Sequence, residues 1–254
     1  MDFIILAERW MSLWKETLEL QHNQEQLLLN IGCTDSLNIT VFVPLYDKIL
    51  IDYPHLDLSI QSHHSSELYG MLSEHNIDIG FVYHQLHYKN IISEKLFEEK
   101  LYLLQSEHPV VEKPIVHTDE LDSTKELFLS WDDNFQIWHD RWLSSVSRPH
   151  ISADTITLLD RLWEKTADTW MIAPESVIHE LSRYRKVYVS ELKNPAPNRI
   201  CYKIKHKYPK NLPANVLLSF LKRFWNSFFI LNARRSRLVK YGADGNCIHI
   251  FLFH

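Results

Sequence analysis

The chain has 254 residues, of which 45% are hydrophobic and 23% are charged, as is typical of a globular protein with a sizeable core. This length suits one large domain or two smaller lobes. The formal net charge of −5 and the sequence pI near 6.3 exclude a global positive field that would attract nucleic acid or an anionic membrane. With five glycines, the chain has no glycine-rich loop of the kind that holds a nucleotide.

The cysteines and the N-terminal segment indicate a cytoplasmic protein. Cys33, Cys201 and Cys247 are widely spaced and include no CxxC pair, which argues against a disulfide scaffold and against a structural zinc site. The apolar run near Met1 is interrupted by Glu8 and Arg9, so it predicts neither a secretory signal nor a membrane span. We expect no membrane partner.

An amphipathic helix is predicted over residues 3–26. This segment has no proline or glycine, and apolar residues recur along it with helical spacing among charged positions. An apolar stripe on a terminal helix needs a partner surface. We therefore expect this helix to pack against another copy of the chain.

Residues 27–82 alternate between predicted strands and helices. Strands are expected at residues 27–32, 56–61 and 77–82, with helices between them. The first helix is expected to have its main body from Pro44, since proline suits a first turn, and to end at Tyr53 and Pro54. The second helix is expected at residues 65–73. This alternation predicts parallel strands joined by right-handed crossovers.

Polar residues follow the ends of these strands. Thr34, Asp35 and Ser36 form a turn after the first strand, and Ser65 opens the helix after the second. The carboxyl ends of parallel strands meet at one edge of a sheet, where ligands bind, and a helix start offers free backbone N–H groups. Asp35 and Ser36 are also ordinary helix N-cap residues, which is the alternative interpretation of this turn.

The rest of the chain predicts a second lobe with the same pattern. Strands at residues 91–97 and 101–104 precede a break at residues 107–114, where we expect the chain to cross between lobes. Further strands are predicted at residues 127–130, 150–151, 170–173 and 187–189, with helices at 135–145, 155–165 and 175–184. After a proline-rich linker at 194–198, a strand at 200–206 and a helix at 213–229 follow. Lobe I is thus predicted at residues 27–107 and 198–229, lobe II at 108–197, and a tail of unknown role at 230–254.

Several short segments resemble, in order and spacing, the effector-binding domain of LysR-type transcriptional regulators. These segments are Leu29 to Gly32, Pro44, Tyr53-Pro54, Ser65 to Leu68, Ile77 to Gly80, Leu96 to Glu99 and Glu107 to Pro109. The resemblance implies an α/β fold with two Rossmann-like lobes, similar to type II periplasmic binding proteins, and a small effector in the cleft between them. It also implies that residues 1–26 are the end of a linker helix. DNA would be contacted only through a winged helix-turn-helix that this chain lacks, and the chain would form a homodimer or homotetramer.

The resemblance also implies a set of effector-binding residues. Thr34, Ser36 and Ser65 match the family's hydroxyl positions. In the second lobe, the strand ends implied to reach the cleft carry Ser130, Trp131, Asp132, Asp154 and Thr155. The family usually has a Gly-x-Gly step before a strand that ends in proline. Here Thr169 and Trp170 stand at that place, which predicts a narrower or reshaped pocket wall.

Hydroxyl groups and helix N-termini favour a ligand with a carboxylate. Asp35 and Asp132 favour an amine instead if they face the cleft, and an amino acid satisfies both conditions. His63 and His64, beside Glu67, invite a metal interpretation, but adjacent histidines on a loop rarely face one ion and no third ligand stands at a characteristic spacing. We therefore expect no metal and no cofactor. Cys33 is either an oxidant sensor or a buried small hydrophobe.

Catalysis is not expected, because Ser36, His64 and Asp35 lack the glycine pattern of a nucleophile elbow. Two other functions remain open. A solute-binding protein of a transporter would share the two-lobed fold, but it should have an export signal and no linker helix. A standalone sensor without DNA binding would act by pairing with full-length regulators.

Overall fold

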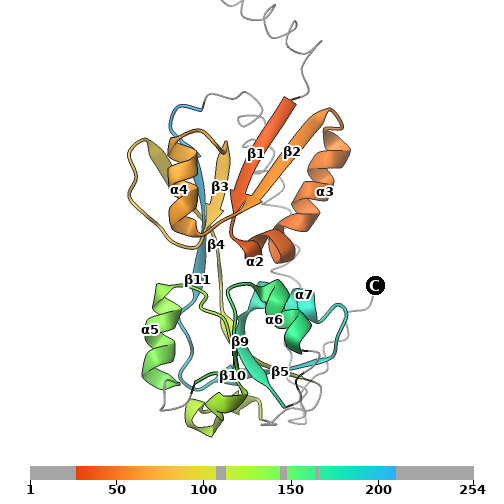
Figure 1. The fold of residues 1–254 in the computed structure, drawn as a ribbon, viewed down its shortest axis with the longest axis vertical. Coiled ribbons are helices and arrows are strands. Elements are labelled where there is room, and N and C mark those ends of the chain that lie inside the picture. The colour runs from red at the N-terminus through yellow and green to blue at the C-terminus, as the bar shows by residue number, and fades with distance from the viewer. Residues whose placement is uncertain (1–26, 107–112, 144–147, 164–165, 167, 210–254) are drawn as a thin grey trace, which may run out of the picture.

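The computed structural model describes residues 27–106, 113–143, 148–163, 166 and 168–209. These residues form two lobes, one above the other in Figure 1. The helices predicted at residues 3–26 and 213–229 and the tail at 230–254 lie outside the described residues. The oligomeric state, which we inferred from residues 3–26, therefore stays a prediction.

The first lobe is built on a five-stranded sheet with the order β2-β1-β3-β11-β4. The strands are β1 (Leu27–Cys33), β2 (Leu56–Ser62), β3 (Ile79–Val82), β4 (Ile91–Glu99) and β11 (Arg199–His206). The predicted parallel pairing is confirmed, because β1 is parallel to both β2 and β3. β11 returns from the second lobe and is antiparallel to β3 and β4.

Helices cover both faces of this sheet. On one face, Leu29 and Ile31 of β1 pack against Leu45 and Ile49 of α3 (Val43–Asp52). On the other face, α4 (Ser65–Ser73) packs through a cluster that includes Leu68, Tyr69 and Leu72. Successive residues of a strand point to opposite faces, and on the α4 side Gly32 of β1 lies close to Leu68.

The chain becomes helical earlier than the sequence indicated. A short helix α2 (Asp35–Leu37) begins directly after β1, and a π-helix η1 (Asn38–Phe42) connects it to α3. Pro44 does lie in the first turn of α3, as predicted. Proline has no N–H to bond the preceding turn, and the wider turns of η1 lead into it. The side chain of Asn38 fixes this segment, since it donates to Ser62 Oγ at 2.7 Å and accepts from Tyr46 Oη at 2.5 Å.

The second lobe holds a four-stranded sheet with the order β6-β10-β5-β9 and a separate two-stranded sheet, β7-β8. The strands are β5 (Leu101–Ser106), β6 (Ile115–Val116), β7 (Leu127–Phe128), β8 (Ile151–Ser152), β9 (Trp170–Pro174) and β10 (Val187–Leu192). The strand β6 was not predicted, and β7 is two residues shorter than the predicted strand. Two residues are too few to show a hydrophobic period.

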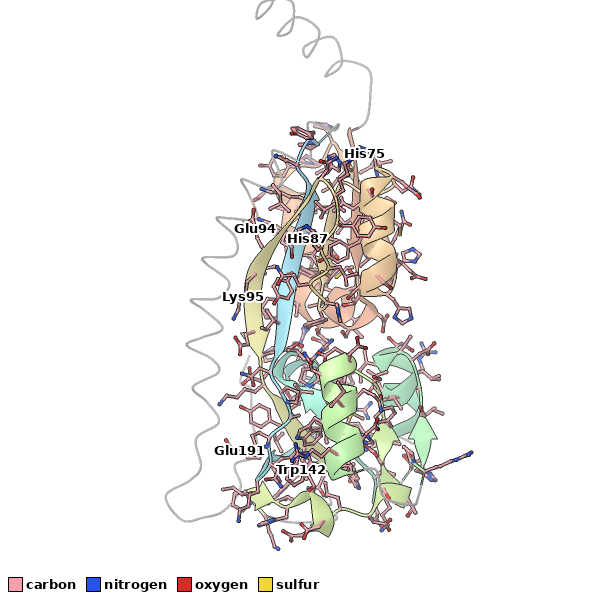
Figure 2. All side chains as sticks on the ribbon, turned by 90° about the vertical axis from the view of Figure 1, so that its left-hand side faces the viewer. His75, His87, Glu94, Lys95, Trp142 and Glu191 are labelled. Atoms are coloured by element: carbon pink, nitrogen blue, oxygen red, sulfur yellow. The ribbon has the colours of Figure 1, made fainter. Side chains whose placement is uncertain are left out.

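The predicted crossing point between the lobes is wrong. β5 pairs with β9 and β10 in the second sheet, so the chain leaves the first lobe at Lys100 and not in residues 107–114. The reason is burial, because Leu101, Leu103 and Leu104 are part of the second lobe's core. The chain returns through residues 193–198, between β10 and β11. Figure 2, turned by 90°, again shows the lobes one above the other, with β4 and β11 running along the upper lobe.

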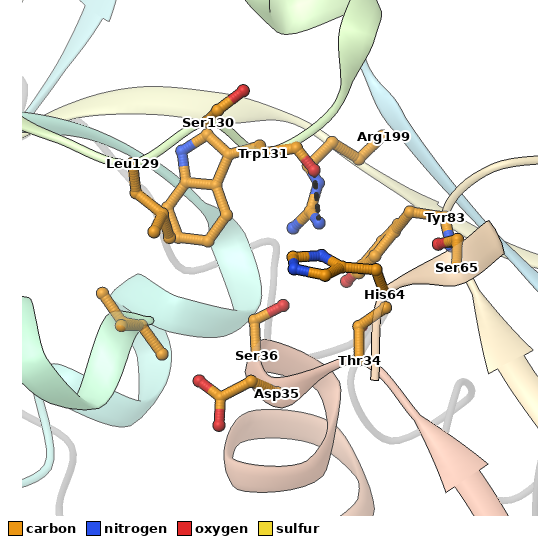
Figure 3. Close-up of a pocket in the computed structure, with 11 residues that line it drawn as sticks. Thr34, Asp35, Ser36, His64, Ser65, Tyr83, Leu129, Ser130, Trp131 and Arg199 are labelled. Atoms are coloured by element: carbon orange, nitrogen blue, oxygen red, sulfur yellow. Dashed lines mark hydrogen bonds between the residues drawn. The ribbon is translucent and has the colours of Figure 1, made fainter. Parts of the chain in front are cut away.

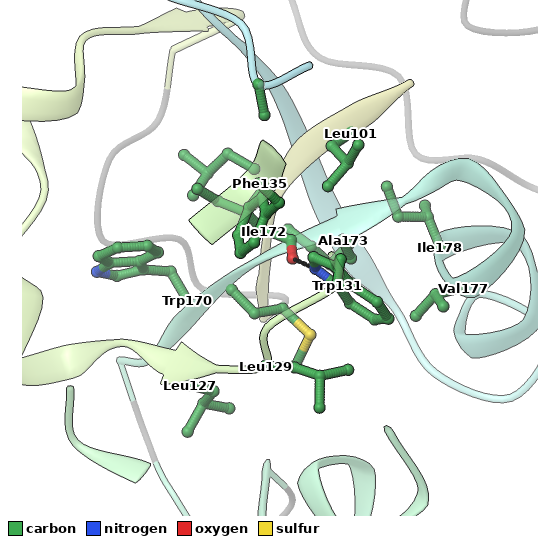
Figure 4. Packing of buried hydrophobic residues seen from close by; sticks show 14 of the residues in the cluster. Leu101, Leu127, Leu129, Trp131, Phe135, Trp170, Ile172, Ala173, Val177 and Ile178 are labelled. Carbon is green, nitrogen blue, oxygen red and sulfur yellow. Dashed lines mark hydrogen bonds between the residues drawn. The ribbon is translucent and has the colours of Figure 1, made fainter. Parts of the chain in front are cut away.

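The core of the second lobe is rich in aromatic side chains, as Figure 4 shows. Trp170 and Ile172 of β9 pack with Phe135, Leu129 and Trp131. Three helices surround this core: α5 (Asp133–Trp142), α6 (Ile156–Trp163) and α7 (Glu175–Leu181). Two short 3₁₀ turns, η2 (Thr118–Glu120) and η3 (Ser123–Lys125), lie between β6 and β7.

Candidate functional site: a cleft between two lobes

A cavity of about 110 Å³ lies where the two lobes face each other. The first lobe lines it with polar side chains from three strand ends, and the second lobe adds residues that precede α5 and begin α6 (Figure 3). The lining residues are Thr34, Asp35, Ser36, His64, Ser65, Tyr83, Leu129, Ser130, Trp131, Ile156 and Arg199.

Sheet topology explains the first-lobe wall. Thr34 follows β1, Ser65 follows β2 and Tyr83 follows β3, and these three strands are parallel. Their carboxyl ends therefore lie at one edge of the sheet. Ser65 Oγ accepts a hydrogen bond from Tyr83 N at 3.2 Å, which ties two of these strand ends together. Thr34 Oγ1 is buried and has no hydrogen-bond partner among the described residues.

Arg199 is the charged side chain at the centre of the cavity wall. It is 2% exposed, and its guanidinium lies 3.4 Å from the centre of the Tyr83 ring. Its Nη2 donates to the backbone oxygen of Trp131 at 3.3 Å, so a first-lobe strand end is bonded to the second lobe. Neither Nε nor Nη1 has a hydrogen-bond partner among the described residues. Each of these two nitrogens nevertheless lies at ion-pair distance from a carboxylate, although neither makes a hydrogen bond to a described residue.

Two carboxylates lie beside this single positive charge. Glu99 Oε1 lies 3.5 Å from Arg199 Nη1, and Asp132 Oδ2 lies 3.8 Å from Arg199 Nε. Glu99 is itself buried, and it accepts from Tyr83 Oη at 2.6 Å and from Ser176 N at 3.1 Å. Burial, with the Glu99 carboxylate, raises the pKa of the Tyr83 hydroxyl well above its usual range, so this hydroxyl keeps its proton and donates.

Asp35 connects the lobes on the opposite side of the cavity. Burial raises the pKa of its carboxyl group, and the nearby Asp154 carboxylate adds to the rise. A hydrogen bond from the backbone N–H of Ile156, at the start of α6, opposes both effects. Asp35 therefore caps a helix of the other lobe. In Figure 3, Asp35 and Ser36 lie across the cavity from Ser130 and Trp131.

Six of the ten predicted effector-binding residues line this cavity, namely Thr34, Asp35, Ser36, Ser65, Ser130 and Trp131. Asp132 lies behind the wall, where its Oδ1 accepts from Phe135 N at 2.8 Å and caps α5. Thr155 does not line the cavity, and its Oγ1 accepts from Leu158 N at 3.4 Å, as in an N-cap at the start of α6. Polar residues at strand ends thus serve both the cavity and the helix starts.

The prediction for Thr169 and Trp170 is wrong. Trp170 is 0% exposed in the second lobe's core, and its Nε1 donates to the backbone oxygen of Asp122 at 3.0 Å. Thr169 is also buried and bonds Thr166. Neither residue is among those that line the cavity.

Five lining residues were not predicted to bind the effector: His64, Tyr83, Leu129, Ile156 and Arg199. A signal for Arg199 was present in the sequence. It follows the proline-rich linker directly, and a residue beside a lobe crossing borders the cleft. Glu99 stands at the other crossing, just before β5, and has the opposite charge. Opposite charges at the two crossings are the pattern that could have revealed this pair.

The described residues contain no group of three His, Cys, Asp or Glu side chains that could hold a metal ion. His63 instead forms a surface contact, with Nδ1 3.5 Å from Glu67 Oε2. Cys33 and Cys201 are fully buried, and burial raises the pKa of both thiols well above the usual range. Such a thiol is not a reactive thiolate at neutral pH, so Cys33 fits the small-hydrophobe interpretation. No described helix has the length and apolar character needed to cross a membrane.

Several solved structures share this fold. The reduced form of the OxyR regulatory domain from Pseudomonas aeruginosa matches with a TM-score of 0.62 and 15% identity, over 79% of this chain and 97% of that chain. The regulatory domain of MexT, a transcriptional activator in the same species, matches with a TM-score of 0.61 and 13% identity, over 78% and 98% of the two chains. A full-length OxyR variant from that species matches with a TM-score of 0.63 and 17% identity, over 85% and 76%. No curated protein matches the sequence significantly.

The family model for the LysR substrate binding domain matches residues 22–226, which is most of the chain. The match covers both lobes and all of the residues that line the cavity. The two-lobed α/β architecture is accordingly of the type II periplasmic-binding-protein kind. The chain belongs to the LysR substrate-binding domain family, the effector-binding regulatory part of LysR-type transcriptional regulators.

Proposed function

We propose that this domain senses a small carboxylate-bearing metabolite, with an amino acid as the preferred class, in the cavity between its lobes and thereby controls transcription. The observation that carries the proposal is Arg199. Its guanidinium lines the cavity, and its Nε and Nη1 lie near Asp132 and Glu99 without making a hydrogen bond to any of the described residues, which supports a role as partner of a ligand carboxylate. Thr34 Oγ1, also without a partner among them, offers one more donor.

The surrounding charges favour a zwitterion over a simple anion. Glu99 and Asp132 lie within 4 Å of the Arg199 guanidinium, so this wall should not bind a simple anion strongly. Asp35 supplies a carboxylate on the other side of the cavity. A ligand with a carboxylate near Arg199 and an ammonium group near Asp35 would pair with the positive charge on one side and the negative charge on the other. The volume of about 110 Å³ suits a ligand of a few carbon atoms.

Sensing follows from the contact that such a ligand makes with both lobes. Thr34 and Ser65 belong to the first lobe, whereas Ser130 and Trp131 belong to the second. A ligand that bonds both walls stabilises the arrangement of lobes in which both are within reach. This shift in the lobe equilibrium is the signal that a DNA-binding module would receive.

Isothermal titration of the chain with small carboxylates, amines and amino acids tests the proposal. We expect one class of amino acid to bind, and Thr34→Ala with Ser36→Ala to weaken binding at least about tenfold, or about 1.4 kcal/mol, because hydrogen bonds to a charged ligand are lost. The matched control is Ser66→Ala with Ser73→Ala, two exposed serines of α4 outside the cavity. Equal affinity in the cavity variant and the wild type would remove this turn from the site.

A further inference from the structure

A second and larger cavity, of about 180 Å³, lies between η1 of the first lobe and α6 and α7 of the second. Figure 1 shows α6 and α7 facing α2 across the boundary between the lobes. Ile39 and Thr40 line this cavity from the first lobe, and Ile156, Val177 and Leu181 are among the residues that line it from the second. Ile156 lines both cavities, so they share one wall.

The inner wall of this second cavity is apolar. Ile156, Val177 and Leu181 are each at most 3% exposed and belong to the second lobe's core. Ile39 extends from η1 and packs against the same core. A π-helical segment is uncommon and is often found at functional sites. The walls come from both lobes, and they offer an apolar body a dry surface on two sides.

The polar lining of the second cavity is acidic. It contains the carboxylates Asp160 and Glu180 and the hydroxyl groups of Thr40, Thr157 and Tyr184, and none of its lining residues is basic. Each carboxylate has one arginine nearby, since Arg185 Nη2 lies 2.5 Å from Asp160 Oδ1 and Arg183 Nη1 lies 3.0 Å from Glu180 Oε2. Neither arginine lines the cavity, so the charged groups among its lining residues are the two carboxylates.

The Tyr184 hydroxyl is hydrogen-bonded to one of these carboxylates, and its pKa is raised. It donates to Asp160 Oδ2 at 3.2 Å. Burial, and then the Asp160 carboxylate, raise the pKa of Tyr184 to about 12, although Arg185 acts in the opposite direction. Burial is the larger cause of this shift, and the Asp160 carboxylate adds to it. The effector cavity differs, because it contains the Arg199 guanidinium.

We propose that the second cavity binds a small primary amine with an apolar body, such as an aralkylamine. The ammonium group would lie at Asp160 and Glu180, and the body would pack against Ile39, Ile156, Val177 and Leu181. Ammonium ions donate three hydrogen bonds, and the two carboxylates and the Thr157 hydroxyl are acceptors present at this rim. This site is separate from the effector site, and it does not depend on which ligand binds there.

Titration calorimetry of the full chain with benzylamine and phenethylamine, against benzyl alcohol and benzoate, tests the proposal. We expect saturable binding of the amines only. Glu180→Gln, which removes a charge from a half-buried rim residue, should weaken amine binding at least about tenfold. Thr157→Trp should block the cavity, because Thr157 is exposed at the rim and a large ring there fills the space.

Two control variants show whether amine binding belongs to this cavity. Glu191→Gln removes an exposed carboxylate of β10 outside the cavity and should leave amine binding unchanged. Thr34→Ala with Ser36→Ala alters the effector cavity and should also leave it unchanged. The proposal is overturned if neither amine binds, if benzyl alcohol binds as well as benzylamine, or if Glu180→Gln and folded Thr157→Trp both keep wild-type affinity. Loss of amine binding in the effector-cavity variant would also overturn it.

Discussion

At the scale of single residues, Arg199 combines a buried position with a charge in the cavity wall. It lies at a lobe crossing, stacks on Tyr83, bonds the backbone of Trp131 and contacts the buried Glu99 carboxylate. Such a pair does not necessarily make the fold more stable than two apolar residues would. It does make the two partners dependent on each other, because each would otherwise be a buried charge without a counter-charge.

Arg199→Met tests this dependence. We expect it to lower the free energy of unfolding by about 3 to 5 kcal/mol, because it leaves Glu99 buried without its cation. Lys95→Met is the control, since Lys95 pairs with Glu98 at the surface and such pairs contribute about 0 to 1 kcal/mol. Urea unfolding followed by tryptophan fluorescence measures both. A loss for Arg199→Met no larger than that of the control would show that Glu99 is adequately solvated.

At the scale of elements, close packing of α4 on the first sheet fixes the strand ends that form the cavity. Gly32 of β1 and Gly80 of β3 lie opposite each other in the parallel register. A Cβ atom added at Gly32 would lie 2.5 Å from Leu68 Cδ2 of α4 and 2.6 Å from Ile77 Cδ1. Glycine is therefore needed here for close approach. Thr34 and Ser65 depend on this contact for their position, since they follow β1 and open α4.

Gly32→Ala should lower the free energy of unfolding by about 1 to 3 kcal/mol, because the added methyl group overpacks the contact. Gly70→Ala is a matched control in α4. Nothing lies within 4 Å of a Cβ atom at Gly70, and alanine favours a helix by up to about 1 kcal/mol. Opposite signs of the two changes in thermal or urea unfolding are expected. A neutral Gly32→Ala would mean that Leu68 and Ile77 move aside at little cost.

At the scale of the whole molecule, the two lobes are held by two crossings and by contacts across the cleft. Asp35 is a titratable contact among these, since it accepts a hydrogen bond from the start of α6 and faces Asp154 of the second lobe. Its pKa is raised from 3.8 in the folded protein. Between the unfolded and the folded pKa the folded state holds more protons, so this carboxyl group makes stability fall as pH rises through that window.

Asp35→Asn should remove this part of the pH dependence. The amide keeps an oxygen that can accept from Ile156 N but cannot ionise, so stability should fall less than in the wild type as the pH rises above about 4. Urea midpoints measured across this range check it, with Asp57→Asn, an exposed residue of β2, as the control that keeps the wild-type slope. Parallel curves for Asp35→Asn and the wild type would contradict the raised pKa.

Several features of the fold and site could be predicted from local sequence. Period-2 and period-3.6 patterns indicated the strands and helices of the first lobe. Their alternation implied the parallel order that brings Thr34 and Ser65 to one edge. Ser130 and Trp131 came from the family resemblance, and they also line the cavity. Each of these features depends on local sequence: on the hydrophobic period of the segment that holds the residue, and on the direction of the strand before it.

The tertiary structure alone decided the features that depend on distant partners. Arg199 and Glu99 are 100 residues apart and meet because β11 is antiparallel to β4. Trp170 looked like part of the cavity wall, but its ring fills the second core. β5 joined the second sheet because its leucines are buried there. Sequence by itself determined the two-lobed α/β class and the polar strand ends. Which side chains face the cleft was decided by packing. The hydrophobic effect is non-directional, so an apolar pattern shows that a residue is buried but not which part of the molecule buries it.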